Sequence, residues 1–285
     1  MLKQRVITAL ILLAIALPAL LADSPMPFTL LALVAMAAAG WEWGRLNGLG
    51  GAASVSLGAI CLTLCSASWV AGWVQQPLLG LWLAAGTAWV LGGAALLRAG
   101  VAGWPTLPRG LRVAGGVLAL WLAWLAVAQA RALGVNFLLS VLTLVWVADT
   151  FAYFAGRAFG LRWTRAKLAP AISPGKSWEG VWGGMLGVLL LALLWVWLDG
   201  ARAAQVPSFY SLLARAGWWL LPLAALFMTA MSVVGDLVES LIKRSAGVKD
   251  SSQLLPGHGG VLDRIDALLP TLPLAMMLTR LASPL

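Results

Sequence analysis

The chain has 285 residues, of which 61% are hydrophobic and only 10% are charged, and its net charge at neutral pH is +9. A soluble domain carries about 25% charged residues, so this composition excludes a soluble globular protein, whose surface it could not cover with polar groups. In a bilayer the same composition is expected, because lipid replaces water as the solvent around apolar helices.

The first apolar run follows Lys3 and Arg5, a pattern shared by signal peptides and by first transmembrane helices. Residues 20–23 lack a clear cleavage site of small residues, so we expect a helix that is retained. A spanning helix needs about 20 apolar residues, and the chain offers about nine such runs. The predicted fold is an all-α, polytopic transmembrane helical bundle, with spans at 6–22, 27–43, 52–73, 78–97, 113–130, 133–155, 178–198, 216–240 and 265–283.

Two groups of small residues within these runs predict close packing of helices. Cys61 and Cys65 are one turn apart in an apolar run, where a disulfide or a metal site is not expected. In the seventh run glycines recur at the small-xxx-small spacing that lets helices approach closely, at Gly180, Gly183, Gly184 and Gly187.

Basic residues predict the orientation, because cytoplasmic loops of membrane proteins are enriched in Lys and Arg. With nine spans and a cytoplasmic N-terminus, all but four of the 19 basic residues fall on the cytoplasmic side. The four exceptions are Arg131, Arg202, Arg215 and Arg280. The two most basic connections, 156–177 and 241–264, then share the cytoplasmic face.

The ten acidic residues are unevenly distributed. Asp23, Glu42 and Asp199 are at predicted span ends, where solvation alone explains them. The other seven lie in or beside the last four spans: Asp149, Glu179, Asp236, Glu239, Asp250, Asp263 and Asp266. An ionisable group at membrane depth costs at least about 2.5 kcal/mol, so these residues are expected to form pairs, face a polar cavity or hold an ion.

Helical spacing divides four of these acids into two pairs. Asp236 and Glu239 are three residues apart, as are Asp263 and Asp266, so each pair shares one helix face. Such carboxylates suit Mg²⁺, which takes one or two carboxylates together with phosphate oxygens. Neutralisation by Lys243 and Arg264 in structural salt bridges explains the same spacing, and both interpretations remain open on spacing alone.

The loop between the two pairs favours a metal–polyphosphate site. It supplies positive charge at Lys243, Arg244 and Lys249, and Arg264 follows it. Its glycines, Gly257, Gly259 and Gly260, can bring backbone N–H groups close to a phosphate. His258, the only histidine of the chain, is either an ordinary loop residue or a group that orients phosphate.

Three stretches together resemble one family. The stretch Ser240-Leu-Ile-Lys243-Arg244-x4-Lys249-Asp250-x-Ser252-x2-Leu255-Pro256-x-His258-Gly259-Gly260-Val261-x-Asp263-Arg264-Ile265-Asp266 resembles the signature of phosphatidate cytidylyltransferases. Residues 149–160 and 173–180 are similar to further motifs of the same family. Family members often carry Lys where this chain has Gly175. The resemblance covers about 149–270, and the earlier part is similar in hydrophobicity only.

The resemblance implies that CTP and phosphatidate react to CDP-diacylglycerol and pyrophosphate. It also implies dependence on Mg²⁺, a second cation such as K⁺, a homodimer, and a multi-pass location in a bacterial-type inner membrane with the active site facing the cytoplasm. No nucleic-acid partner is expected. Residues 1–130 are then a transmembrane scaffold, and 131–285 the catalytic region.

The resemblance also assigns roles to individual residues. Asp236, Asp263 and Asp266 are expected to bind the metal, and with Lys243 to form the catalytic group. The predicted substrate-binding residues are Asp149, Ser173, Lys176, Ser177, Arg244, Lys249, His258, Gly259, Gly260 and Arg264. Residues 173–180 are expected to start a helix whose positive end, with Lys176 and Ser177, faces a phosphate; an ordinary capped helix start is the alternative.

An ion-coupled transporter is the main alternative from another class, because intramembrane acids also mark ion pathways. Transporters often have repeated halves with matching broken helices, whereas here the polar residues crowd one half. Asp263 and Asp266 also loosely resemble the Asp-rich motif of intramembrane prenyltransferases, but a second such motif is absent from the sequence. The motif of CDP-alcohol phosphotransferases is absent too.

Overall fold

A computed structural model describes residues 2–282, with side chains from Gln4 onward. The side chain of Lys3 and residue 283, which the predicted orientation and last span include, lie outside this description. Within it, nine helices are long and apolar enough to cross a membrane, which confirms the all-α bundle of about nine spans. They are α1 (Leu2–Leu21), α2 (Met26–Leu46), α3 (Gly51–Val70), α4 (Leu79–Gly103), α5 (Arg109–Leu133), α6 (Val135–Phe159), α7 (Trp178–Ala201), α9 (Leu220–Ser245), and α10 (Leu262–Ile265) continued by α11 (Leu268–Ala282).

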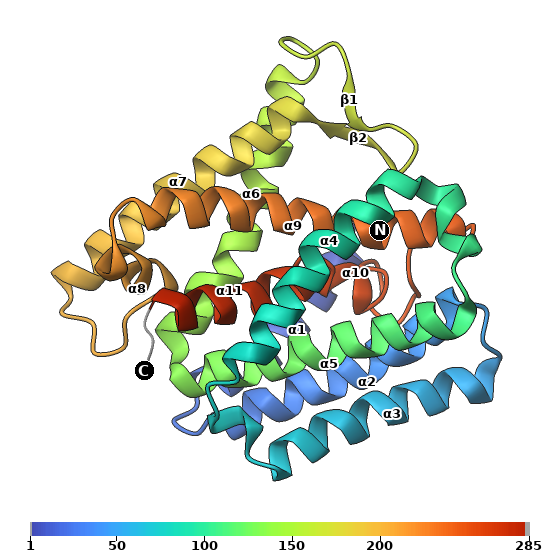
Figure 1. Ribbon diagram of the computed structural model, residues 1–285, viewed down its shortest axis with the longest axis horizontal. Coiled ribbons are helices and arrows are strands. Elements are labelled where there is room, and N and C mark those ends of the chain that lie inside the picture. The colour runs from blue at the N-terminus through green and yellow to red at the C-terminus, as the bar shows by residue number, and fades with distance from the viewer. Residues whose placement is uncertain (1, 283–285) are drawn as a thin grey trace.

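The helices form two groups joined by the last one (Figure 1). Helices α2, α3 and α5 lie side by side, and α6, α7 and α9 contact one another in a second group. Helix α11 contacts α4 and α5 as well as α6, α9 and the short helix α8 (Phe209–Ala216), so it joins the two groups. The predicted division at residue 130 falls near the end of α5 and stays a prediction.

The predicted small-residue packing is confirmed. A methyl group added to Gly183 would lie 2.1 Å from Cβ of Ala155, and one added to Gly184 would lie 2.9 Å from the carbonyl oxygen of Ala148. Because α6 and α7 are this close, only glycine fits at these positions of their interface. Cys61 and Cys65 are fully buried free thiols, as expected of packing residues.

A short helix and its cap correct one sequence expectation. Asp199 was expected to be solvated at a span end, but it accepts hydrogen bonds from Asn136 Nδ2 (2.8 Å), Ser208 N (2.9 Å) and Ser211 Oγ (2.6 Å). Ser208 caps α8 (Phe209–Ala216), a helix that the hydrophobicity pattern did not predict because it is too short to span a membrane. Asp199 therefore fixes the connection between α7 and α8.

The 160–177 connection contains a small hairpin above the α6–α7 pair (Figure 1). Strands β1 (Lys167–Ala169) and β2 (Ser173–Ser177) are antiparallel, with Lys167 paired to Ser177 and Ala169 to Ser173. The prediction that residues 173–180 start a helix is therefore correct only from Trp178 onward. Pro174 and Gly175 have low helix propensity, and the chain stays extended until Ser177 caps α7 by accepting from Gly180 N at 3.2 Å.

Candidate active site

The candidate site is built mainly on one face of α9. Asp236, Glu239 and Lys243 follow one another at helical spacing, so their side chains project from the same side of the helix. Helix α9 ends at Ser245, and residues 246–261 form the loop that leads to α10, which carries Asp263. We refer to residues 246–261 as the signature loop.

Lys243 is the centre of a buried charge cluster. Its ammonium group forms ion pairs with Glu239 and, at 2.5 Å, with Oδ1 of Asp263. Lys243 is 8% exposed and Glu239 5% exposed, so these charges have little access to solvent. Two of the predicted catalytic residues, Lys243 and Asp263, are thus in direct contact. The salt bridges that the spacing left open as an alternative are also present here.

Asp263 also holds the signature loop in place. Its Oδ2 accepts hydrogen bonds from Gly260 N (2.7 Å), Ser251 N (2.9 Å) and Ser251 Oγ (2.8 Å). With Lys243 on Oδ1 and three donors on Oδ2, this carboxylate could bind a cation only through the acceptor capacity left on Oδ1. The backbone N–H of Gly260, which was predicted to approach a phosphate, donates its hydrogen bond to Asp263.

A second group of charges lies beside the hairpin. Lys176 of β2 pairs with Oδ2 of Asp236 at 2.5 Å, and both side chains are partly exposed. Asp149 of α6 is within electrostatic reach of Asp236 and Lys176. Asp266, which follows α10, is within reach of Asp236, Asp149 and Lys243. The structure thus brings predicted residues from four separate segments to one region.

The donor set fits a hard cation such as Mg²⁺ only in part. Among the residues that the structure describes, no three His, Cys, Asp or Glu side chains are gathered closely enough to hold a metal by themselves. Asp266 has one oxygen that accepts a hydrogen bond from Ala267 N at 2.8 Å and a second that accepts none from the described residues. This suits Mg²⁺, which usually combines one or two carboxylates with water and phosphate oxygens.

The predicted basic residues outside these groups are exposed. Arg244 donates to the carbonyl of Val248 at 3.1 Å, and Arg264 donates to the carbonyl of His258 at 3.0 Å. Nδ1 of His258 is buried and has no hydrogen-bond partner in the part of the chain that the structure describes. These contacts order the loop and leave the remaining guanidinium donors open to solvent.

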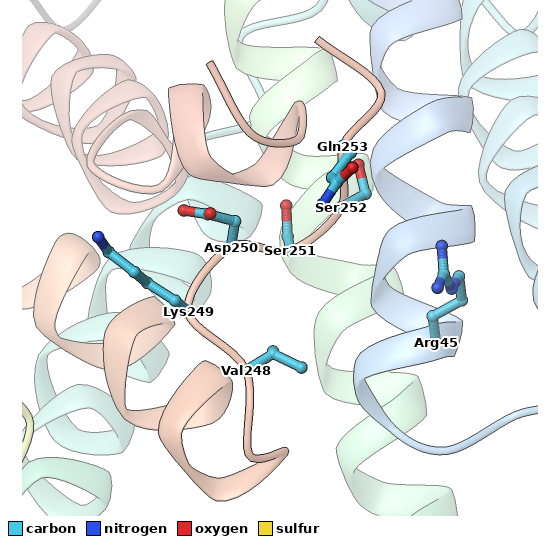
Figure 2. Close-up of a pocket in the computed structure, with 7 residues that line it drawn as sticks. All are labelled: Arg45, Val248, Lys249, Asp250, Ser251, Ser252 and Gln253. Carbon is cyan, nitrogen blue, oxygen red and sulfur yellow. The ribbon is translucent and has the colours of Figure 1, made fainter. Parts of the chain in front are cut away.

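A polar cavity of about 520 Å³ adjoins the signature loop. Residues 248–253 form one side, and Arg45 of α2 stands on the other (Figure 2). Lys249 and Asp250 point away from Arg45 in this view. Arg45 was not among the predicted site residues, because the only feature of the sequence that distinguished it was its position after the second predicted span.

An apolar cavity of about 380 Å³ lies beside the hairpin. Its lining includes Leu97 of α4, residues 168–172, Trp178 and Leu237. It therefore adjoins β1, the turn that follows β1, and α9, which carries Asp236; Ile172 and Trp178 of the lining flank β2, which carries Lys176.

Three residues of the 173–180 stretch have structural roles in the hairpin and at the start of α7. Ser177 uses its hydroxyl as the cap of α7, as in the alternative of an ordinary capped helix start. Ser173 only begins β2. Glu179 is buried and accepts from the N–H groups of Trp163 (3.1 Å) and Thr164 (2.7 Å), so it holds the start of the hairpin connection.

Glu42 is the residue that sequence reasoning missed. It was expected to be solvated at a span end, but it is 0% exposed and binds the signature loop. The signal was present in the sequence: Glu42 lies between Trp41 and Trp43, with Gly40 and Gly44 beyond, in a segment without another acid. A carboxylate in so apolar a segment is costly unless it is paired or hydrogen-bonded.

Comparison with known proteins identifies relatives over the whole chain. The sequence model described as "Cytidylyltransferase family" matches residues 3–282. A phosphatidate cytidylyltransferase of Pseudomonas aeruginosa is 39% identical over 280 residues, covering 96% of this chain and 95% of that protein. Those of Haemophilus influenzae (50% over 140 residues) and Thermotoga maritima (43% over 144 residues) match about half of each chain.

Proposed function

The chain belongs to the cytidylyltransferase family, and from that premise we propose that it is a phosphatidate cytidylyltransferase, which converts CTP and phosphatidate into CDP-diacylglycerol and pyrophosphate. The observation that carries the proposal is the similarity to the Pseudomonas aeruginosa protein, because it spans 96% of this chain and 95% of that protein. The comparisons give no support to the alternative of an ion-coupled transporter.

The reaction joins two anions. A phosphate oxygen of phosphatidate attacks the α-phosphorus of CTP and forms the new phosphoanhydride bond. The bond from the α-phosphorus to the oxygen that bridges to the β-phosphate breaks, and pyrophosphate leaves with that electron pair. No covalent enzyme intermediate is required, so the protein has to neutralise charge and align the reactants.

The cations of the site suit that task. Lys243 is held by two carboxylates, so its ammonium group is fixed before substrate binds. Lys176 is partly exposed and can exchange Asp236 for a phosphate oxygen. We assign Lys243, Arg244, Lys249 and Arg264 to phosphates of the nucleotide or the lipid, with His258 and the glycines beside them shaping the loop. Preorganised positive charge of this kind acts where negative charge develops.

Magnesium is part of the proposal. When bound, Mg²⁺ would neutralise phosphate charge and polarise the phosphoryl oxygens. We assign it to Asp266, one oxygen of which accepts no hydrogen bond from the described residues, and to Asp236, whose Oδ2 would have to release Lys176. Asp263 was also predicted as a metal ligand, and that role stays a prediction. A second cation such as K⁺ rests only on the family resemblance.

The lipid substrate and the location belong to the same proposal. The lining of the apolar cavity includes Ile172 and Trp178, which flank the strand that carries Lys176, and we propose that an acyl chain of the lipid enters this cavity. We propose a bacterial-type inner membrane with the site on the cytoplasmic side, as the distribution of Lys and Arg favours. A homodimer is proposed from the resemblance, and the mass of the purified protein in detergent tests it.

The activity is tested by incubating the purified protein with labelled CTP and phosphatidate and measuring CMP incorporation into chloroform-soluble lipid. Pyrophosphate release in equal amount is expected, and no product should form without phosphatidate. Absence of labelled lipid under all metal conditions would refute the proposed reaction. Substrate flux in proteoliposomes without lipid turnover would favour a transporter instead.

A further inference from the structure

Glu42 is a fully buried carboxylate in the N-terminal half of the chain, and the mechanism above does not use it. Four donor groups face it, all in the signature loop or at the first residue of α10, and one of them, the hydroxyl of Ser251, divides its single proton between Glu42 and Asp263. The donors are separated from Glu42 by 209 to 220 residues in the sequence. Helix α2 therefore forms direct hydrogen bonds with the signature loop through this side chain.

The four hydrogen bonds are arranged symmetrically. Oε1 accepts from Ser252 Oγ at 2.6 Å and from Val261 N at 2.9 Å. Oε2 accepts from Ser251 Oγ at 3.3 Å and from Leu262 N at 2.8 Å. Each oxygen thus takes one hydroxyl from the first part of the loop and one backbone N–H from its end. The carboxylate closes the loop by holding both ends together.

The contact leads directly to Asp263. The hydroxyl of Ser251 lies 3.3 Å from Glu42 Oε2 and 2.8 Å from Asp263 Oδ2. Asp263 in turn binds Lys243. A chain of polar contacts therefore runs from α2 through the loop to the lysine that we assign to substrate phosphate.

The loop is shaped to admit Glu42. A methyl group added to Gly260 would lie 2.3 Å from Glu42 Oε1 and 2.1 Å from Ser251 Oγ, so glycine is required there for the carboxylate to reach its donors. The first part of the loop runs beside α2, across the polar cavity from Arg45 (Figure 2).

A buried charge without a counter-ion needs such donors. Among the described residues, no Lys or Arg forms an ion pair with Glu42. A carboxylate removed from water is costly unless several donors point at it. The observed conformation of the loop supplies these donors, so Glu42 favours it over conformations that withdraw them.

We infer that Glu42 is a positioning residue for the reaction: it holds residues 251–262 in the conformation that places Asp263 against Lys243. The effect on rate rests on the proposed function, whereas the effect on the loop does not. The N-terminal half of the chain then contributes to the reaction by positioning the loop and does not only form a scaffold.

The decisive variant is Glu42→Gln, which keeps the shape but replaces one acceptor oxygen with an NH₂ group facing two donors. Outer residues that orient catalytic groups typically contribute about 10- to 100-fold to activity, and a fall of that size in kcat is expected. KM for CTP should change by no more than about threefold, because Glu42 is not assigned to a substrate contact. Glu42→Asp keeps both acceptors on a shorter stem and should recover part of the rate.

Thr29→Val is the matched control. Thr29 is a buried residue of the same helix, 3% exposed, and among the described residues its hydroxyl forms a hydrogen bond only with the carbonyl of Pro25. This variant should keep kcat within about twofold of the original protein. A general defect of α2 would lower kcat in both Glu42→Gln and Thr29→Val.

Hydrogen exchange measures the loop without any substrate. In the original protein the amides of Val261 and Leu262 should exchange slowly, and in Glu42→Gln at least about tenfold faster, while α9 amides stay unchanged. Faster exchange in a protein that makes no CDP-diacylglycerol would support the positioning role and reject the proposed function. If Glu42→Gln does not fold, Glu42→Asp and Ser252→Ala, which removes one of the four donors, are compared by the same exchange.

Two results would overturn the inference. One is unchanged exchange of residues 251–262 in the folded variants. The other is a kcat per folded molecule equal to that of the original protein, which would leave Glu42 with a purely structural role.

Discussion

Nζ of Lys243 lies 2.5 Å from Oδ1 of Asp263, which ties the last turn of α9 to α10. The same ammonium group also pairs with Glu239. A lysine shared between two buried carboxylates is both a structural link and a fixed positive charge in the site, and the first prediction separates these roles.

Replacing Lys243 with methionine should destabilise the protein and abolish activity. The change leaves Glu239 and Asp263 buried without their cation, and breaking a buried ion pair typically costs about 3–5 kcal/mol. Thermal unfolding in detergent measures the loss. Adding Glu239→Gln should restore part of the stability but none of the activity, since the cation is still missing. An unchanged unfolding midpoint in Lys243→Met would contradict the prediction.

Replacing Lys176 with methionine should affect activity far more than stability. Its pair with Asp236 has side chains 27% and 28% exposed, and an ion pair this accessible contributes at most about 1 kcal/mol. Loss of a phosphate-binding cation should lower kcat/KM about 100-fold. Lys167→Met in the neighbouring strand β1 is the matched control, and its kcat/KM should stay within about twofold of that of the original protein. Equal effects of both variants would remove Lys176 from substrate binding.

Removal of divalent metal should stop the reaction. Chelation with EDTA is expected to abolish CMP incorporation, and added Mg²⁺ to restore it. Asp266→Asn should raise the Mg²⁺ concentration for half-maximal rate at least about tenfold. Asp23→Asn, at an exposed position after α1, should leave that concentration unchanged. A full rate in excess chelator would reject the metal proposal.

The dependence of the rate on Mg²⁺ concentration also tests the predicted role of Asp263 as a metal ligand. If Asp263→Asn shifts the Mg²⁺ requirement as Asp266→Asn does, Asp263 belongs with the metal ligands. If it lowers kcat at saturating Mg²⁺ without that shift, its contacts to Lys243 and Ser251 account for its importance.

Replacing Gly260 with alanine should disrupt the signature loop. The added methyl group would lie about 2 Å from Ser251 Oγ and from Glu42, and overpacking of this kind costs about 1–3 kcal/mol. Activity should fall at least about tenfold, because the loop carries contacts of Asp263. Gly175→Ala is the control, since no atom lies within 4 Å of its added methyl group. Full activity in Gly260→Ala would show that the loop tolerates rearrangement.

The spans could be predicted from sequence alone. Apolar length is a local property, so runs such as 178–198 and 27–43 correspond to α7 and α2 within a few residues. The family and its reaction could also be predicted from the sequence, because the pattern from Ser240 to Asp266 is continuous in the chain. The glycines of α7 indicated close packing for the same reason: their spacing is fixed by the helix itself.

Only the tertiary structure decided which charges meet. Helical spacing grouped Asp263 with Asp266, but Asp263 is engaged by Lys243 and Ser251, while Asp266 lies within reach of Asp236 and Asp149. Glu42 and Asp199 were predicted to be solvated because they lie at span ends, and the apolar neighbours of Glu42 indicate only that it needs partners, not which ones. The partners of Glu42 lie more than 200 residues away, and Asp199 joins Asn136, which is 63 residues away, to Ser208 and Ser211 at the start of α8. Composition and spacing determine which residues enter the membrane, but hydrogen bonds between distant segments form only once the helices have packed.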